Sequence, residues 1–266
     1  MTAAGQYSRR AVRRSAVALL GALVLGGCGS GAAAVASRTV SSSKTTAQTS
    51  STATVTPVVT SPAAPAVALS ADAARVEAEL HGIAQRGLVL GRVDAPVTIV
   101  EYADLLCTVC AEVHDNVLPA VIAGAVRAGR ASLELRPVVG SSASRALALA
   151  AYSAGVQGRG WQFVQLAFRR IGVAGSPAEP AQALAAALSL DLRRWRSDLK
   201  LGSWKTDISG ALDVVRVAGF GAYPVFLVAR AAVSSTTQPP PYIVVTAPSS
   251  ARSLERAIAE ALARRG

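Results

Sequence analysis

Few residues in this chain could do covalent chemistry at neutral pH. The sequence has three cysteines and two histidines, and two of the cysteines, Cys107 and Cys110, are separated by only two residues. A thiolate is both a nucleophile and a metal ligand, and two thiols this close can join in a disulfide that opens and closes. The pair could therefore serve redox exchange, metal binding or structural cross-linking.

Redox exchange explains the pair better than the other two uses. A structural disulfide across two residues would constrain the unfolded chain very little, because the loop it closes is so small. A structural zinc ion takes four ligands, and the only histidines are His81 and His114, with no second cysteine pair. We therefore expect no metal and no cofactor beyond a redox-active Cys107–Cys110 disulfide, and zinc or copper binding with His114 is the alternative.

The sequence predicts that the pair lies where a strand passes into a helix. Residues 97–102 form a β-favouring run after the turn-like segment 94–96, which is typical of a central strand. Beyond the pair, apolar residues recur at helical spacing as far as Gly129, and Pro119 should kink that helix rather than end it. Cys107 would then lie at a helix N-terminus, where free N–H groups stabilise a thiolate and lower the pKa of its thiol.

The remaining chain alternates strand and helix patterns. We expect strands at 131–136, 225–228 and 242–245, and helices at 145–152, 161–171, 178–190, 205–217 and 254–262. The order is strand, helix, strand, a block of helices, two strands and a closing helix. This order predicts an α/β thioredoxin fold with a central mixed β-sheet and an inserted helical subdomain at about 141–217.

The segment 95–102 followed by C-x-x-C resembles the DsbA-like branch of the thioredoxin superfamily. Weaker agreement comes from 150–168 and from Gly221-Ala222-Tyr223-Pro224-Val225-Phe226. The resemblance covers about residues 70–266 and implies a protein disulfide oxidoreductase. It also implies a cis peptide bond before Pro224, packed against the disulfide.

The resemblance further implies where substrates bind. Ala222 and Tyr223 would offer backbone groups to an extended substrate peptide, and Thr108 and Val109, between the cysteines, would also contact it. Thr108 and Val109 supply no imidazole, whereas the strongest oxidants of the family have a histidine there. Tyr223 is also bulkier than is usual at its position, so we expect a narrower groove.

Glu101, six residues before Cys107, stands where the family has a buried acid beneath the pair. A buried carboxylate can take up or return the proton of Cys110. The alternative places Glu101 at the end of its strand facing solvent. Asp104 is nearer to the pair in sequence, but we expect it on a loop and more exposed.

The N-terminal residues predict export and lipidation. An arginine-rich segment leads through an apolar stretch, too short to span a bilayer, into Leu-Gly-Gly-Cys ending at Cys28. This resembles the bacterial lipobox, which implies that residues 1–27 are a signal peptide and that Cys28 carries the lipid. A secretory signal with an unmodified cysteine and a transmembrane helix are the alternatives, and twin-arginine export is also open. Residues 28–69, rich in Ser, Thr, Ala and Pro, predict a flexible linker to a domain at 70–266.

The charge does not predict nucleic-acid binding. The formal net charge is +11, but four arginines lie in the leader, so the mature chain would carry +7. The other arginines are scattered and form no basic block, so a solvated surface explains them better.

We therefore expect a thiol-disulfide oxidoreductase, lipid-anchored on the extracytoplasmic side of the cell membrane. It would form disulfides in exported cysteine-containing proteins and be reset by a membrane quinone-linked oxidase. The alternatives are an extracytoplasmic thiol reductase or isomerase, for example in cytochrome maturation, a copper-delivery lipoprotein that uses His114, and a binding module with a vestigial pair.

Overall fold

The computed structural model describes residues 64–171, 180–201, 203–231 and 241–264. All of them belong to one compact unit, Val58–Gly266. The expected signal peptide, Cys28 and the linker as far as residue 63 lie outside the described residues. Among the described residues no single helix is long and apolar enough to cross a membrane. One bent pair of helical segments, Thr108–Asn116 with Leu118–Val126, is long and apolar enough, but by length and composition only.

A six-stranded mixed sheet forms the centre of this unit, with strand order β1-β2-β4-β3-β5-β6. The strands are β1 (Gln85–Arg86), β2 (Val89–Leu90), β3 (Val97–Ala103), β4 (Ala131–Pro137), β5 (Val225–Arg230) and β6 (Ile243–Thr246). β3 lies between a parallel β4 and an antiparallel β5, so the expectation of a central strand at 97–102 is confirmed. The hairpin of β1 and β2 was not predicted, because strands of two residues carry no measurable alternation.

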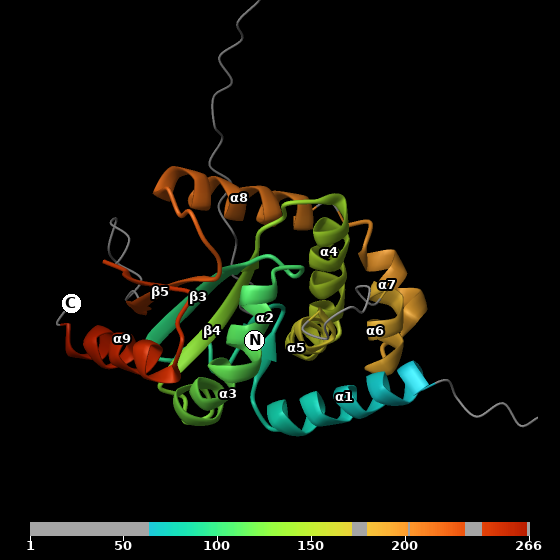
Figure 1. Cartoon of the computed structure of the whole chain (residues 1–266), viewed down its shortest axis with the longest axis horizontal. Coiled ribbons are helices and arrows are strands. Elements are labelled where there is room, and N and C mark those ends of the chain that lie inside the picture. The colour runs from blue at the N-terminus through green and yellow to red at the C-terminus, as the bar shows by residue number, and fades with distance from the viewer. Residues whose placement is uncertain (1–63, 172–179, 202, 232–240, 265–266) are drawn as a thin grey trace, which may run out of the picture. The chain divides into compact units, whose positions relative to one another are not determined.

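Alternation along β3 decides which residues face which layer. Ile99 and Ala103 belong to the main core under α2 and α9, whereas Val100 and Tyr102 pack with α8 on the opposite face of the sheet. Figure 1 shows α8 across the sheet from α9. Successive side chains of a strand point to opposite faces, so Glu101 shares the face of Ile99 and Ala103 and lies beneath α2.

The helices follow the expected patterns, with three differences. They are α1 (Ala64–Leu80), α2 (Thr108–Asn116), α3 (Leu118–Val121), a π-helical turn η1 (Ile122–Val126), α4 (Ser142–Val156), α5 (Gly160–Ile171), α6 (Ala181–Ala187), α7 (Leu192–Asp198), α8 (Ser203–Ala218) and α9 (Ala251–Ala263). The predicted kink near Pro119 is confirmed as a 44° bend between α2 and the α3–η1 segment. α7 and the π-helical form of η1 were not predicted.

The third difference is α1, which begins at Ala64, before the expected domain start at residue 70. The Ala-rich composition of this stretch led us to include it in the linker, but alanine is also the best helix former. Ion pairs join this helix to α5 and to the residue before it, Glu79 with Arg169 on α5 and Glu77 with Arg159. These contacts, which no local pattern reveals, bind α1 to the helical insertion.

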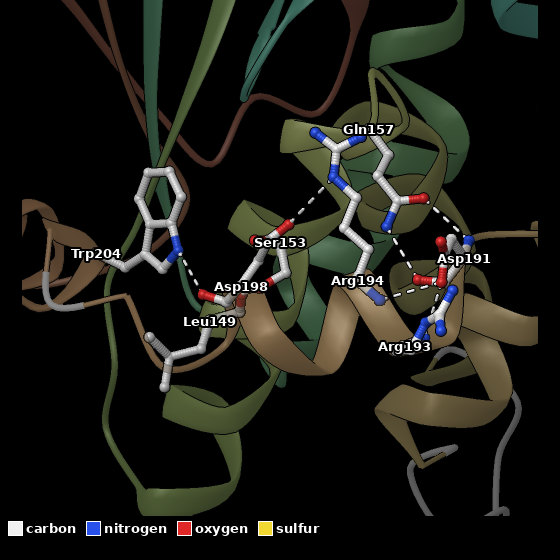
Figure 2. Close-up of polar contacts among 8 residues, drawn as sticks. All are labelled: Leu149, Ser153, Gln157, Asp191, Arg193, Arg194, Asp198 and Trp204. Carbon is white, nitrogen blue, oxygen red and sulfur yellow. Dashed lines mark hydrogen bonds and ion pairs between the residues drawn. The ribbon is translucent and has the colours of Figure 1, made fainter.

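Polar contacts hold the inserted helices together (Figure 2). The side chain of Gln157, at the end of α4, accepts a hydrogen bond from the backbone N–H of Asp191 at 3.0 Å and donates one to its carbonyl at 3.2 Å. The carboxylate of Asp191 caps α7 by accepting from the N–H groups of Arg193 and Arg194. Trp204 Nε1 donates to the carbonyl of Asp198, which joins the start of α8 to the end of α7.

We expect Gln157→Ala to lower the free energy of unfolding by about 1 kcal/mol, because two partly exposed hydrogen bonds are lost. Gln157→Glu should give a smaller loss, since a carboxylate still accepts from Asp191 N–H but cannot donate to its carbonyl. Denaturant unfolding measures both changes. An alanine variant as stable as the wild type would show that the Gln157 bridge contributes nothing.

Candidate active site

The loop between β3 and α2 positions the two cysteines. Asp104 accepts a hydrogen bond from Leu106 N through its side chain at 2.8 Å and from Cys107 N through its carbonyl at 2.9 Å. Cys107 is the N-cap of α2, and its sulfur accepts the backbone N–H of Cys110 at 3.1 Å. A cysteine therefore fills a helix position that serine or aspartate usually occupies. The expected place of the pair at a strand-to-helix junction is confirmed.

The two thiols differ in exposure and in acidity. Cys107 is partly exposed and Cys110 is fully buried. The hydrogen bond with the Cys110 side chain lowers the pKa of Cys107 to about 7, burial opposes this shift, and the backbone N–H groups of Cys110 and Val109 support it. The same side-chain hydrogen bond, followed by burial and the charge of Glu101, raises the pKa of Cys110 far above its ordinary value. Cys107 is thus the reactive thiolate and Cys110 the protonated partner.

Glu101 is fully buried beneath the pair, so the alternative in which it faces solvent is wrong. Its Oε1 lies 2.9 Å from Nε2 of His114, and its Oε2 has no hydrogen-bond partner among the described residues. Asp104, as expected, lies on the loop and is more exposed. The charge of this buried carboxylate contributes to the raised pKa of Cys110.

Sequence reasoning missed the role of His114, which it considered only as a metal ligand. The ring is buried, and its Nδ1 lies 3.0 Å from Oε1 of Gln165 on α5. Its face lies against Phe168, with 4.0 Å between the ring centroids. Both ring nitrogens are thus engaged within the protein, and among the described residues no group of three His, Cys, Asp or Glu side chains could hold a metal.

A cis peptide bond joins Tyr223 to Pro224, which confirms that expectation. A mainly apolar groove of about 310 Å³ lies beside it, and Cys107 is one of the residues that line this groove. The groove is lined by Asp104, Leu106, Cys107, Val138, Val139, Gly140, Leu212 and Tyr223. Of these lining residues, only Cys107 and Tyr223 were predicted from the sequence as site residues. The others come from the β3–α2 loop, from the residues after the end of β4 and from α8, which only the folded chain brings together.

The other residues predicted to bind substrate lie beside this groove. Thr108 and Ala222 are exposed, and the side chain of Val109 is 44% exposed. None of the three lines the groove itself. They are available to a peptide that extends beyond the groove, and their contact with substrate remains a prediction.

Comparisons with known proteins agree with this geometry. The model of a family described as Thioredoxin matches residues 84–238, which is more than half of the chain. Three similar solved structures share the fold. A variant of alpha-DsbA1 of Wolbachia pipientis has a TM-score of 0.56 and 18% sequence identity, and the match covers 65% of this chain and 89% of that chain. A thioredoxin-like oxidoreductase of Silicibacter pomeroyi has a TM-score of 0.52 and 22% identity, with 66% and 92% covered, and oxidised BdbD of Bacillus subtilis has a TM-score of 0.52 and 18% identity, with 68% and 97% covered. A comparison with curated proteins found no match.

The chain belongs to the thioredoxin family, and its fold is that of the DsbA-like proteins. With the dithiol at the start of α2, it is a thiol-disulfide oxidoreductase.

Proposed function

We propose that this protein forms disulfide bonds in exported, cysteine-containing proteins on the extracytoplasmic side of the membrane. The observation that carries the proposal is the asymmetry of the pair. A partly exposed, acidic Cys107 lies at the mouth of an apolar groove, and a buried Cys110 with a raised pKa lies behind it. Such a pair can pass its disulfide to a substrate and then be released from it.

In the oxidising direction, a substrate thiolate attacks the sulfur of Cys107 and forms a mixed disulfide. The bond between Cys107 and Cys110 breaks, and Cys110 leaves as a thiolate that gains a proton. Glu101, buried beneath it, passes on that proton, which it takes up from the substrate thiol when the attacking thiolate forms. A second substrate thiolate then attacks the substrate sulfur and displaces Cys107, whose lowered pKa makes it a good leaving group.

The groove favours a protein over a small thiol as the substrate. Its walls are mainly apolar side chains, several of them from the end of β4 and from α8, so it suits an unfolded segment that still exposes apolar residues. The peptide would run past Ala222 and Tyr223 and pair with their backbone groups as an added strand.

We expect Leu212→Glu to slow the oxidation of a reduced, unfolded protein about tenfold, because a charge in the groove must be desolvated when the peptide binds. Oxidation of dithiothreitol should change little, because that small dithiol needs no groove. Val217→Glu is the matched control, since Val217 is on the same helix, is 89% exposed and lies outside the groove. Equal rates for Leu212→Glu and Val217→Glu with the protein substrate would contradict this role of the groove.

A specific observation keeps the reductase or isomerase as a second candidate. Thr108 and Val109 bring no imidazole to the Cys107 thiolate, so the reduced form is less stabilised than in oxidants that have a histidine there. We therefore infer a moderate oxidant, reset by a membrane quinone-linked oxidase. Mixing the oxidised protein with a reduced substrate, without a membrane partner, should transfer about one disulfide per Cys107–Cys110 pair, and no transfer would favour the reductase.

The location is inferred from the leader and from the Leu-Gly-Gly-Cys motif at Cys28. Lipid on Cys28 and a linker would hold the oxidoreductase domain near the membrane. The full chain expressed in a bacterium should fractionate with the membrane, and Cys28→Ser should release it. Membrane association of the Cys28→Ser variant would contradict the lipid anchor.

A further inference from the structure

The polar cluster of Glu101, His114 and Gln165 occupies the interior between the sheet and two helices. Glu101 is on β3, His114 on α2 and Gln165 on α5, and all three side chains are almost fully buried. The exchange steps described above use only Glu101. The remaining two residues connect the active-site acid to the helical insertion.

The hydrogen-bond geometry limits where the hydrogens can lie. Oε1 of Gln165 can only accept, so Nδ1 of His114, at 3.0 Å, carries a hydrogen and donates it. Nε2 of His114, at 2.9 Å from Oε1 of Glu101, faces a carboxyl oxygen. If Glu101 is ionised, Nε2 must donate as well, and the ring is then an imidazolium.

Burial penalises any charge in the cluster that has no partner. An ionised carboxylate without a counter-charge is costly in the interior, and an imidazolium at hydrogen-bond distance compensates it. Within the described part of the chain Oε2 of Glu101 has no hydrogen-bond partner, so the bond to His114 leaves one oxygen of the carboxylate unoccupied.

The charged groups that bear on His114 come from α2, α5 and α1 as well as from β3. Besides Glu101, the neighbouring Asp115 interacts with its charge, and Asp115 in turn interacts with Arg169 on α5 and with Glu79 and Asp72 on α1. The faces of the ring are covered by the aromatic side chains of Trp161 and Phe168. No cation in this set lies closer to Glu101 than His114 does.

We propose that His114 is a positioning residue for disulfide exchange: held as an imidazolium by Gln165, it keeps Glu101 ionised and therefore able to take the proton of Cys110. The inference rests on the proposed redox function of the pair.

Protons and bonds balance in both directions of the exchange. When Cys110 resolves a mixed disulfide, its proton passes to Oε2 of Glu101, and the new thiolate attacks the sulfur of Cys107. The bond between Cys107 and substrate breaks, the substrate leaves as a thiolate, and the proton on Glu101 returns to it through solvent. In the reverse direction a substrate thiol gives its proton to Glu101, which protonates Cys110 as it leaves, and His114 remains unchanged.

The first arm of the test needs no substitution in the cluster. The chain has only two histidines, so ¹⁵N NMR of the wild type at neutral pH gives two imidazole spectra, and His81→Gln assigns them. We expect both nitrogens of His114 to carry hydrogen. A neutral ring, protonated at Nδ1 alone or at Nε2 alone, would overturn the proposal. Protonation at Nε2 alone would mean that Gln165 donates from its NH₂ group to Nδ1 rather than accepting through its oxygen.

The second arm follows the resolving step in the reduced protein after it reacts with glutathione disulfide, by acid quench and mass measurement of the mixed disulfide. His114→Gln keeps a donor for Glu101 but no charge, and should slow resolution about tenfold to 100-fold. The pH dependence of its rate should also differ from that of the wild type, because the counter-charge beside Glu101 is removed.

The double variant separates this role from packing. If His114 acts through Glu101, then Glu101→Gln with His114→Gln should resolve no more slowly than Glu101→Gln alone. Additive losses, or an unchanged pH profile in His114→Gln, would overturn the proposal, and His81→Gln should behave as the wild type. Failure of the redox function would instead appear as a wild type that forms no mixed disulfide, in which case the NMR arm still decides the state of His114.

Discussion

Replacing Cys107 with serine is expected to reduce disulfide exchange with protein thiols to the rate of the buffer alone. The serine hydroxyl does not ionise near neutral pH, and it cannot form the mixed disulfide through which every exchange passes. Cys110 cannot take over, because it is fully buried and burial contributes to its raised pKa. Oxidation of a reduced protein substrate, followed by alkylation and mass measurement, tests this expectation.

Cys110→Ser is the matched variant, and it should fail in a different way. Its Cys107 still attacks a substrate disulfide, but no second thiol resolves the intermediate, so covalent complexes with substrate should accumulate. Their loss on reduction would confirm the linkage. Residual turnover in Cys107→Ser, or complexes attached through Cys110 in the wild type, would show that the roles of the two cysteines are reversed.

The reaction of Cys107 with an alkylating reagent should depend steeply on pH. Because the pKa of its thiol is lowered to about 7, the rate should be half-maximal near pH 7 and about 100-fold below its plateau at pH 5. Cys110 should not react in the folded protein, because it is buried. The charge of Asp104 raises the pKa of Cys107, so Asp104→Asn should move the midpoint slightly to lower pH. A midpoint near the ordinary value of 9.0 would contradict the N-cap account.

The same shift makes the stability of the reduced protein depend on pH. The pKa of Cys107 is lower in the folded than in the unfolded chain, so ionisation favours the folded state. The stabilisation is complete above about pH 9 and is lost as the pH falls through about 7. Since Cys107 is partly exposed, screening leaves about 1 kcal/mol of it. Comparing denaturant unfolding of the reduced wild type with that of Cys107→Ser isolates this contribution.

Local patterns in the sequence predicted the parts of the fold that carry strong periodicity. β3 is a continuous β-favouring run, and α2 repeats its apolar residues at helical spacing, so the junction that holds Cys107 was predictable. The two-residue strands β1 and β2 carry too little pattern to be recognised. α1 was not predicted, and the domain start was placed at residue 70, because the contacts that stabilise this helix come from α5 and the residue before it, far along the chain.

The active site shows the same division between local and long-range information. Cys107, Cys110 and Glu101 were predicted because they lie close together in sequence around one junction. His114 shares a helix with Cys110, and its spacing of four residues could have placed it on the same face, toward β3. Its bond to Gln165, 51 residues away, depends on how α2 packs on α5. The walls of the groove likewise come in part from β4 and α8, which no local pattern brings together.

The most direct test of the account is the reduction potential of the Cys107–Cys110 pair, measured by equilibrating the protein in glutathione buffers and determining its redox state by alkylation and mass. The account predicts one intramolecular disulfide with a potential above that of thioredoxin, which is about −270 mV. A potential at or below that value would overturn the oxidising role and favour the reductase. Failure to form the disulfide in any buffer would contradict the central claim that this pair is a redox centre.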